Sequence, residues 1–332
     1  MGVPIVDISP LFEGLSTDPS FQHAAHALVK ALSTSGLLFI KGFGLTREDC
    51  IQLLDAGRLL FLLEQKEDVK IKSGGFSRGY MAKGGESGSN KLELKEGFVY
   101  GYNWDSDSLL ALESQRQRTR LHGNNVWPPG LPPNQRKLLC DFYTKASDIC
   151  MALTRGVCFV LGVHWDEFCA RGREISLMRL FHYFPSPKES IQRLDTIGSS
   201  AHTDWGFLTL ILQDLVGGLA YKEMGEWKSV PALEDYSLVV NCGDYLSLLS
   251  GGKLRSPLHQ VTLSSAHRFS FVYFFYPDYD AKMPLATSGK KTEQSLFLNQ
   301  AEAVDEPSLQ NFDGPFGDYI FAKWKQVFRK GY

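Results

Sequence analysis

The sequence predicts a mainly β fold with helices, in which a helical layer wraps a β core to form one compact unit. Two observations support this prediction. Apolar residues recur at helical spacing in the first part of the chain, whereas short apolar segments separated by turn residues follow from about residue 175. The length of 332 residues and the hydrophobic fraction of 43% allow a large buried core, which excludes a disordered chain.

Helix and strand signals alternate near the N-terminus. An Asp-Pro pair at 18–19 is typical of a helix start, and the apolar run at 37–43 predicts a buried strand. Thr46 and Asp49 have the spacing of a capping box, which predicts a second helix over about 50–66.

The middle of the chain predicts a loop and a long helix. Residues 73–90 are rich in glycine and serine and predict a mobile loop, whereas residues 134–161 carry apolar side chains at helical spacing. The β half then contains the segments SLMRLFHYF, FLTLILQD, SLVVNCGDYLSLL and RFSFVYFFYP. Short strands without intervening helices favour a sandwich or barrel, which a helix over 316–329 closes.

Charge and cysteine content exclude several functions. The chain has 35 basic and 37 acidic residues, which is not the balance of a protein that binds nucleic acid through its net charge. No signal-peptide pattern is present, and no apolar stretch is long enough to span a bilayer. The six cysteines form no CxxC pair, so we expect reduced thiols in a cytoplasmic protein.

A candidate metal site begins with His202 and Asp204. Residues two apart on a strand share a face, so this imidazole and carboxylate point to one place. The third ligand is His259, which lies 55 residues after Asp204, or alternatively His267. Two histidines and one carboxylate form the facial triad of non-haem Fe(II) oxygenases, which leaves positions open for substrate and O₂.

Arg268 and Ser270 form a second pair on one strand face. A guanidinium and a hydroxyl that point into an apolar barrel are suited to bind a carboxylate. If Arg268 points inward, His267 points outward, which favours His259 as the third ligand.

These motifs resemble the isopenicillin-N-synthase-like family of 2-oxoglutarate/Fe(II)-dependent oxygenases. The resemblance runs nearly from end to end, and its most specific part is HxD, a later histidine and RxS nine positions beyond it. The similar segments are VPIVDISPL, SGLLFIKGFGL, RGY with KEGFVYG, NVWP, MRLFHYFPSP, AHTDWGFLTLILQD, LVVNCGDYLSLLSGGKLRSPLHQV and RFS.

The resemblance implies a double-stranded β-helix (jelly roll) core wrapped by helices. It divides the chain into an N-terminal α/β region at 1–130 and, at 131–332, a helix plus the jelly-roll core and the C-terminal helix, together one compact unit. It further implies Fe(II) as cofactor, with 2-oxoglutarate and O₂ as cosubstrates.

The resemblance also assigns residues to roles. By position, the iron ligands are His202, Asp204 and His259. The cosubstrate-binding residues are Arg268 and Ser270 on the C5 carboxylate, and Tyr183.

The substrate site is assigned from the same resemblance. Tyr100 and Phe274 are expected to line the pocket, and Phe181 to form an apolar wall where the family has asparagine. The neighbouring His182 is a second departure, because the family has tyrosine there. Arg78 is expected to be a solvated loop arginine, with pairing to an anionic substrate as the alternative.

Two aromatic residues that flank the HxD strand, Trp205 and Phe207, are expected to pack in the core. No basic stripe with interleaved aromatics is present, so we expect no nucleic-acid partner.

The expected reaction is hydroxylation or desaturation of a small organic molecule of secondary metabolism, with release of succinate and CO₂. Two alternatives remain, namely an oxidase of the same fold that does not use 2-oxoglutarate, and a non-catalytic small-molecule binding protein. We expect a monomer with no membrane partner.

Overall fold

The computed structural model of the 332-residue chain describes residues 2–71, 78–84, 91–104, 121, 123–186, 196–284 and 312–329. The helices are α1 (Ser9–Glu13), α2 (Pro19–Thr34), α3 (Arg47–Leu62), α5 (Pro133–Leu161), α7 (Asp244–Leu249) and α9 (Phe316–Arg329), with 3-10 turns at Glu64–Val69, Trp165–Glu167 and Gly172–Glu174. The strands are β1 (Ile5–Asp7), β2 (Leu37–Lys41), β3 (Gly79–Met81), β4 (Leu92–Glu93), β5 (Lys95–Gly101), β6 (Leu177–Tyr183), β7 (Thr196–Ile197), β8 (Ser199–His202), β9 (Leu208–Gln213), β10 (Leu219–Glu223), β11 (Glu226–Ser229), β12 (Leu238–Cys242), β13 (His259–Val261) and β14 (Arg268–Phe275).

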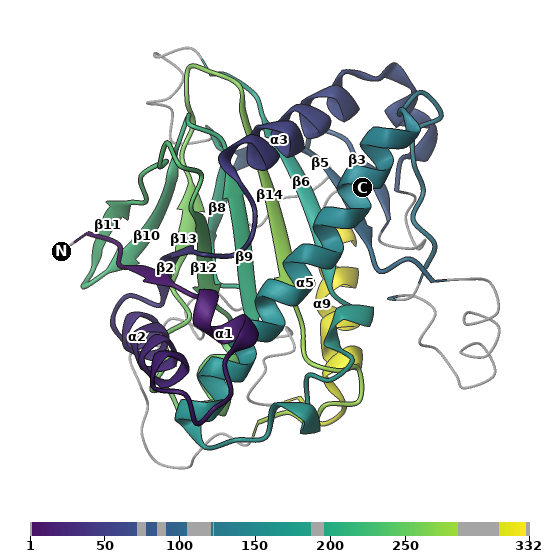
Figure 1. The fold of residues 1–332 in the computed structure, drawn as a ribbon. Coiled ribbons are helices and arrows are strands. Elements are labelled where there is room, and N and C mark those ends of the chain that lie inside the picture. Colours follow the sequence, from purple (N-terminus) through teal and green to yellow (C-terminus); the bar gives the residue numbers. More distant parts are fainter. Residues whose placement is uncertain are drawn as a thin grey trace.

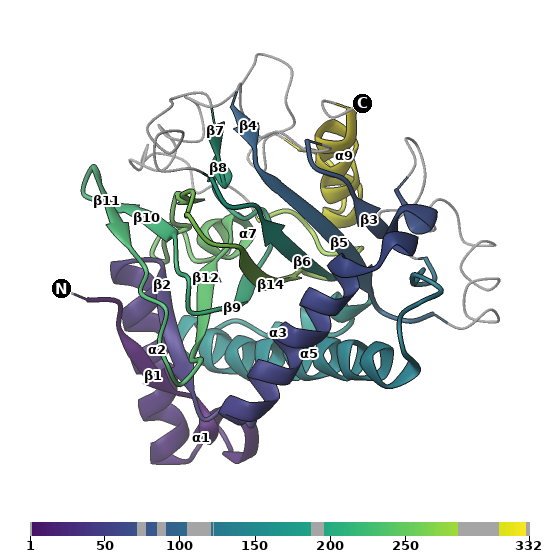
Figure 2. The same ribbon diagram turned by 90° about the horizontal axis from the view of Figure 1, so that it is seen from above.

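Three sheets form from these strands. The large sheet has eight strands in the order β1-β2-β12-β9-β14-β6-β5-β3, and the smaller one has four in the order β11-β10-β13-β8. Strands β4 and β7 pair as a third sheet. The long helix α5 and helix α3 lie across one face of the large sheet, and the four-stranded sheet lies on its other side (Figures 1 and 2). The predicted β core with a helical layer is therefore confirmed.

The two faces of the large sheet bury two different apolar clusters. On the helix side, Phe271 of β14 packs edge-to-face on Phe142 of α5, with ring centroids 5.5 Å apart. On the other side, a smaller cluster lies between the sheets and contains Phe181, Tyr183 and Val272. We call this second side the inner face. The clusters are separate because neighbouring residues on a strand point to opposite faces.

The N-terminal helix signals are confirmed by the structure. Helix α2 begins at Pro19 directly after Asp18, and α3 begins at Arg47. The predicted capping box is present, because Thr46 Oγ1 accepts from the Asp49 amide while Asp49 Oδ2 accepts from the Thr46 amide. Helix α3 ends earlier than expected, at Leu62, where a 3-10 turn follows.

A short strand lies within the loop predicted at 73–90. Residues 78–84 are described, and within them Gly79–Met81 forms β3, which pairs with β5 at the edge of the large sheet. Residues 73–77 and 85–90 lie outside the described part of the chain. The glycines predicted a loop, but Gly79 has φ +117° and lets this short strand begin in a conformation that other residues avoid.

Among the helices that the described ranges contain, none combines the length and hydropathy needed to cross a bilayer.

A buried polar cluster lies on the helix side of the large sheet. Glu96 of β5 accepts from His182 Nδ1 at 2.7 Å and from the Tyr80 hydroxyl at 2.6 Å, and it pairs with Lys66 at 3.1 Å. Burial opposes its charge, but these three donors outweigh burial and hold the pKa of the Glu96 carboxyl below its ordinary value. His182 Nε2 in turn lies 2.7 Å from Nδ1 of His267, so both histidines belong to this buried polar cluster on the helix side.

The Glu96→Gln substitution is expected to lower the free energy of unfolding by about 3 kcal/mol, because it removes the buried charge on which the donors converge. The Glu96 carboxyl has a lower pKa in the folded protein than in the unfolded chain, where it is about 4.3. Its charge therefore contributes to stability above that pH, and this contribution is lost as the pH falls through the folded-state pKa. The variant should therefore lose stability less steeply than the wild type in acid, as measured by urea unfolding at several pH values.

A matched control is Asp55→Asn, which breaks the exposed pair of Asp55 with Arg58 on α3. Its effect should stay within about 0.5 kcal/mol. An equally small effect for Glu96→Gln would contradict the prediction.

Candidate metal centre

Three predicted ligands converge where the small sheet meets the turn after β8. His202 at the end of β8 pairs with His259 at the start of β13, and their ring centroids lie 4.3 Å apart. Asp204 Oδ1 lies 3.9 Å from His202 Nε2 and 3.7 Å from His259 Nε2. One ligand atom from each residue lies within 4.8 Å of the other two. The i, i+2 spacing and the strand pairing together produce this convergence.

Both imidazoles are oriented for coordination through Nε2. His202 Nδ1 donates to the Ser200 carbonyl at 2.7 Å, and His259 Nδ1 donates to the Pro257 carbonyl at 3.0 Å. Since a carbonyl only accepts, each Nδ1 carries the proton and each Nε2 keeps its lone pair. Desolvation by the surrounding protein and the facing His259 lower the pKa of His202 to about 4, although 42% of its side chain is exposed. The rings are therefore suited to bind a cation.

Backbone packing behind Asp204 fixes its carboxylate. The Asp244 amide donates to the Asp204 carbonyl at 2.7 Å, and Asn241 Nδ2 lies 3.4 Å from Asp204 Oδ2. A Cβ at Gly243 would lie 2.1 Å from the Gly206 carbonyl oxygen, so this close approach requires glycine. The motif NCGD at 241–244 was the available signal for these contacts, but sequence reasoning assigned no role to Asn241 or Asp244.

The donor set fits a first-row divalent ion. Bonds from such ions to imidazole nitrogen and carboxylate oxygen are about 2.0–2.2 Å, so two ligands of one ion lie at most about 4 Å apart. The two distances to Asp204 meet this limit, and the two imidazole nitrogens lie within 4.8 Å of each other. Two nitrogens and one oxygen, without a thiolate, match the facial triad.

Arg268 forms a second binding feature on the inner face. Its side chain is 2% exposed; Nε donates to the Gly217 carbonyl at 2.6 Å and Nη1 donates to Ser270 Oγ at 3.2 Å. Nη2 donates to Gln213 Oε1 at 3.1 Å, and the described residues place no carboxylate in an ion pair with it. Three of five N–H groups are used, which leaves two for a bound carboxylate. Sequence reasoning missed Gln213, which no motif singled out.

The inner face also carries three other predicted residues. Tyr183 lies opposite Arg268 across β6 and β14, and the Arg268 guanidinium carbon lies 4.7 Å from the centre of the Tyr183 ring. Phe181 belongs to the inner apolar cluster, and Phe274 packs against both clusters. Their positions allow the predicted roles without testing them.

Two predictions need correction. Tyr100 points to the helix side, where its hydroxyl donates to the Leu139 carbonyl at 2.9 Å, so it does not line the inner face. The reason is register, because its neighbour Val99 lies opposite the inner-face residue Arg179. Arg78 is 5% exposed, so the expected solvated loop arginine is wrong.

The remaining predicted residues lie as expected. His267 points to the buried polar cluster on the helix side, where it contacts His182. This is the direction expected if its neighbour Arg268 points to the inner face. Trp205 packs edge-to-face on Trp324 of α9, with ring centroids 5.9 Å apart, and Phe207 is fully buried.

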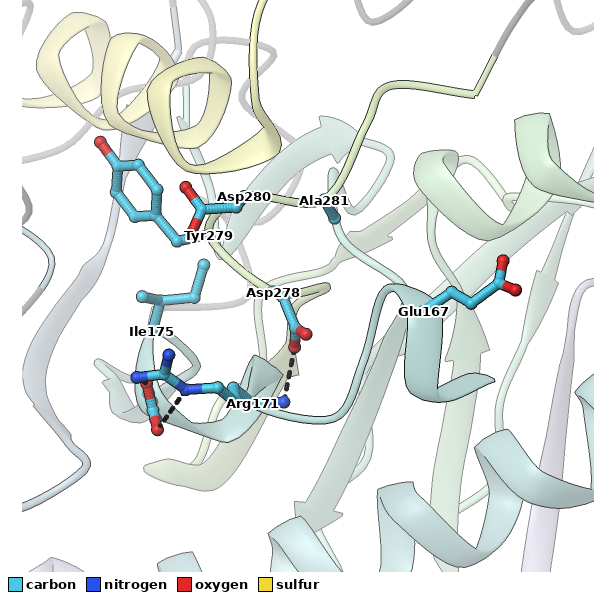
Figure 3. A pocket seen from close by; sticks show the side chains of 8 residues that line it. Glu167, Arg171, Ile175, Asp278, Tyr279, Asp280 and Ala281 are labelled. Carbon is cyan, nitrogen blue, oxygen red and sulfur yellow. Dashed lines mark hydrogen bonds and ion pairs between the residues drawn. The ribbon is translucent and has the colours of Figure 1, made fainter. Parts of the chain in front are cut away.

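A separate surface pocket contains none of the triad residues. It lies between the 3-10 turns after α5 and the segment after β14, and Figure 3 shows the side chains that line it. Arg171 there donates from Nε and Nη2 to both oxygens of Glu174, at 3.0 and 2.8 Å. Its guanidinium is thus already paired, unlike that of Arg268.

Comparisons with known proteins agree with this geometry. Residues 174–277 match the 2OG-Fe(II) oxygenase superfamily, and residues 3–130 match the N-terminal region described as non-haem dioxygenase in morphine synthesis. The 2-oxoglutarate-dependent dioxygenase citB of Monascus ruber is 32% identical over 94% of this chain and 96% of its own length. Homoarginine-6-hydroxylase 2-ODD-C23 of Glycine max is 31% identical over 86% and 88%.

Solved structures extend the agreement to the fold. A full-length Neurospora crassa protein, crystallised in complex with alpha-KG, has a TM-score of 0.75 at 22% identity, covering 98% of this chain and 96% of that one. The chain therefore belongs to the 2OG-Fe(II) oxygenase superfamily, and its core is the predicted jelly roll. Within that superfamily it is a 2-oxoglutarate-dependent dioxygenase, an oxidoreductase whose cofactor is Fe(II) and whose cosubstrate is 2-oxoglutarate.

Proposed function

We propose that His202, Asp204 and His259 hold the iron and that Arg268 and Ser270 hold the distal carboxylate of 2-oxoglutarate. The observation that carries this proposal is the convergence of the three ligand atoms within 4.8 Å of one another. His259 and Val261 share a face of β13, and Val261 belongs to the inner cluster, so the ligands open toward the same interior as Arg268.

The protein residues have distinct tasks around these groups. When bound with O₂, iron and 2-oxoglutarate supply the oxidative decarboxylation that yields succinate and CO₂ and oxidises a C–H bond of the substrate. Two neutral imidazoles and one carboxylate fix the ion on one side only. Arg268 orients the cosubstrate, and the Tyr183 ring covers the guanidinium. Phe181 and Phe274 form apolar walls that exclude water.

The primary substrate is proposed to be a small organic molecule that is hydroxylated or desaturated. The name of the Glycine max relative describes a hydroxylation of homoarginine, which supports a small-molecule substrate for this chain. The chemistry of the inner face, with aromatic walls and buried cations, is consistent with such a molecule.

The test is absorbance spectroscopy under anaerobic conditions. Adding Fe(II) and 2-oxoglutarate to the protein should produce a visible metal-to-ligand charge-transfer band, and O₂ with a substrate should then release succinate. Zn(II) in place of Fe(II) should give neither signal. Product formation without a band or succinate would favour the alternative oxidase that does not use 2-oxoglutarate.

The cellular setting is also a proposal, namely a cytoplasmic monomer that acts in secondary metabolism. All six cysteines are free thiols, which supports a reducing compartment. Sedimentation velocity tests the monomer, microscopy of a fluorescent fusion tests the compartment, and metabolite profiles with and without the protein test the metabolic role.

A further inference from the structure

A second buried guanidinium, that of Arg78, has no acidic partner in the described part of the chain. Arg78 lies directly before β3 and is 5% exposed. Its Nη2 donates to the Leu121 carbonyl at 3.3 Å, and its Nε has no hydrogen-bond partner among the described residues. Arg171 (labelled in Figure 3), by contrast, is 58% exposed, and it binds Glu174 through two nitrogens.

The Arg78 guanidinium lies over the inner face of β5. A Cβ built on Gly101 would lie 2.4 Å from Nη2 and 2.5 Å from Cζ, so the guanidinium occupies the space where a side chain would stand. Gly101 and Val99 are two apart on β5 and share a face, and Val99 lies opposite Arg179 on β6. This is the face that carries Phe181 and Tyr183.

Tyr276 connects this region with the metal ligands. Burial raises the pKa of the Tyr276 hydroxyl, and the Asp204 carboxylate adds to the rise, whereas Arg179 and Arg78 oppose it. These effects place the hydroxyl within electrostatic range of two guanidiniums and one iron ligand. By the position of Gly101, the Arg78 guanidinium lies on the same face of the large sheet as Arg268, and it also interacts with the Tyr143 hydroxyl of α5 at the end of β5.

Aromatic rings pack on another guanidinium of the inner face, that of Arg179. The Arg179 guanidinium carbon lies 4.6 Å from the centre of the Phe181 ring and 5.1 Å from that of Trp324 on α9. Trp324 also packs on Trp205, which follows the iron ligand Asp204 in sequence. A molecule bound on this face would find both aromatic rings and guanidinium groups.

The charge of Arg78 opposes the burial of its side chain. Desolvation lowers the pKa of this guanidinium to about 10, so it is still a cation at neutral pH. A buried cation with unused N–H donors is stabilised by a bound anion, and the planar fork of arginine fits a carboxylate. Since Arg268 is the arginine proposed to bind 2-oxoglutarate, Arg78 is available to bind the primary substrate.

We propose that Arg78 binds the carboxylate of the primary substrate, which is then an organic acid whose apolar or aromatic body packs on the inner face beside Arg179, Phe181 and Trp324. This inference rests on the proposed function, because it assigns the substrate class of the same site.

The test compares organic acids with their uncharged primary amides. Hexanoate, phenylacetate and 3-phenylpropanoate, each paired with its amide, are titrated into the anaerobic Fe(II)·2-oxoglutarate enzyme while tryptophan fluorescence is recorded. At least one acid should bind with a Kd below about 1 mM and at least about tenfold more tightly than its amide. The Arg78→Gln variant should lose this preference, and the Arg171→Gln control should keep it.

A second variant keeps the arginine and moves it. Gly101→Ala places a Cβ where the Arg78 guanidinium lies, so it should weaken binding of the acid at least about fivefold and leave binding of the amide unchanged. This variant tests the position of the guanidinium even if Arg78→Gln does not fold.

The outcomes separate this inference from the proposed function. The inference would be overturned if no acid in the panel bound with a Kd below about 1 mM and at least about tenfold more tightly than its amide. It would also be overturned if the preference for the acid over its amide survived in both Arg78→Gln and Gly101→Ala. Loss of the 2-oxoglutarate band in Arg78→Gln, but not in Arg268→Gln, would make Arg78 the cosubstrate anchor and overturn it too. Absence of the band in the wild type, with the acid preference intact, would instead overturn the proposed iron and cosubstrate assignments alone.

Discussion

The His202→Ala substitution is expected to lower 2-oxoglutarate turnover by at least about 1000-fold, equivalent to about 4 kcal/mol, while the fold is kept. The loss follows because His202 supplies one of the three ligand atoms that converge in the described part of the chain. The fold should persist because 42% of this side chain is exposed, so its removal creates little cavity. Succinate release measures the turnover, and circular dichroism with thermal unfolding measures the fold. Asp204→Ala should have the same effect on turnover.

The matched control is His164→Ala, which removes an exposed histidine that follows α5. This variant should retain the turnover and the iron content of the wild type. Near-native turnover in His202→Ala with iron supplied would show that the ligands are assigned wrongly.

The Arg268→Gln substitution is expected to raise the KM for 2-oxoglutarate by about 100-fold, with a smaller change in kcat. Two charge-assisted hydrogen bonds to the distal carboxylate are lost, and together they are worth about 3 kcal/mol. Gln keeps much of the side-chain volume, and Ser270 and Gln213 remain as polar neighbours. Initial rates of succinate release across a range of 2-oxoglutarate concentrations give both constants.

Arg58→Gln is the control for loss of an arginine near the same strand. The Arg58 side chain is 41% exposed and its guanidinium carbon lies 5.3 Å from the centre of the Phe269 ring, on the opposite face of β14. Its KM for 2-oxoglutarate should remain within about twofold of the wild type. An unchanged KM in Arg268→Gln would refute the assigned role and favour the oxidase that does not use 2-oxoglutarate.

Local patterns predicted much of the fold and of the site. The capping box at Thr46 and Asp49 depends on residues three apart, and the structure contains both hydrogen bonds. His202 with Asp204, and Arg268 with Ser270, depend on residues two apart on or beside a strand, and each pair points the same way. Such patterns are readable because the interacting groups are close in sequence.

Contacts between strands that are distant in sequence could not be predicted from such local patterns. All seven residues of β5 are buried, so its apolar pattern does not tell which face is the inner one, and Tyr100 was assigned to the wrong face. Arg78 was expected in solvent because glycine and serine surround it in sequence. Its burial depends on Gly101, which lies on another strand and has no side chain to fill the space.

The separation of the two apolar clusters by the large sheet has a consequence for how such an enzyme diversifies. The helix-side cluster contains most of the buried apolar residues, whereas the inner cluster is small and contains the walls proposed for the reactants. Substitutions at Phe181, which belongs to the inner cluster, would reshape those walls and leave the larger cluster in place. New specificities are then accessible to mutation at a modest thermodynamic penalty, which makes the scaffold evolvable.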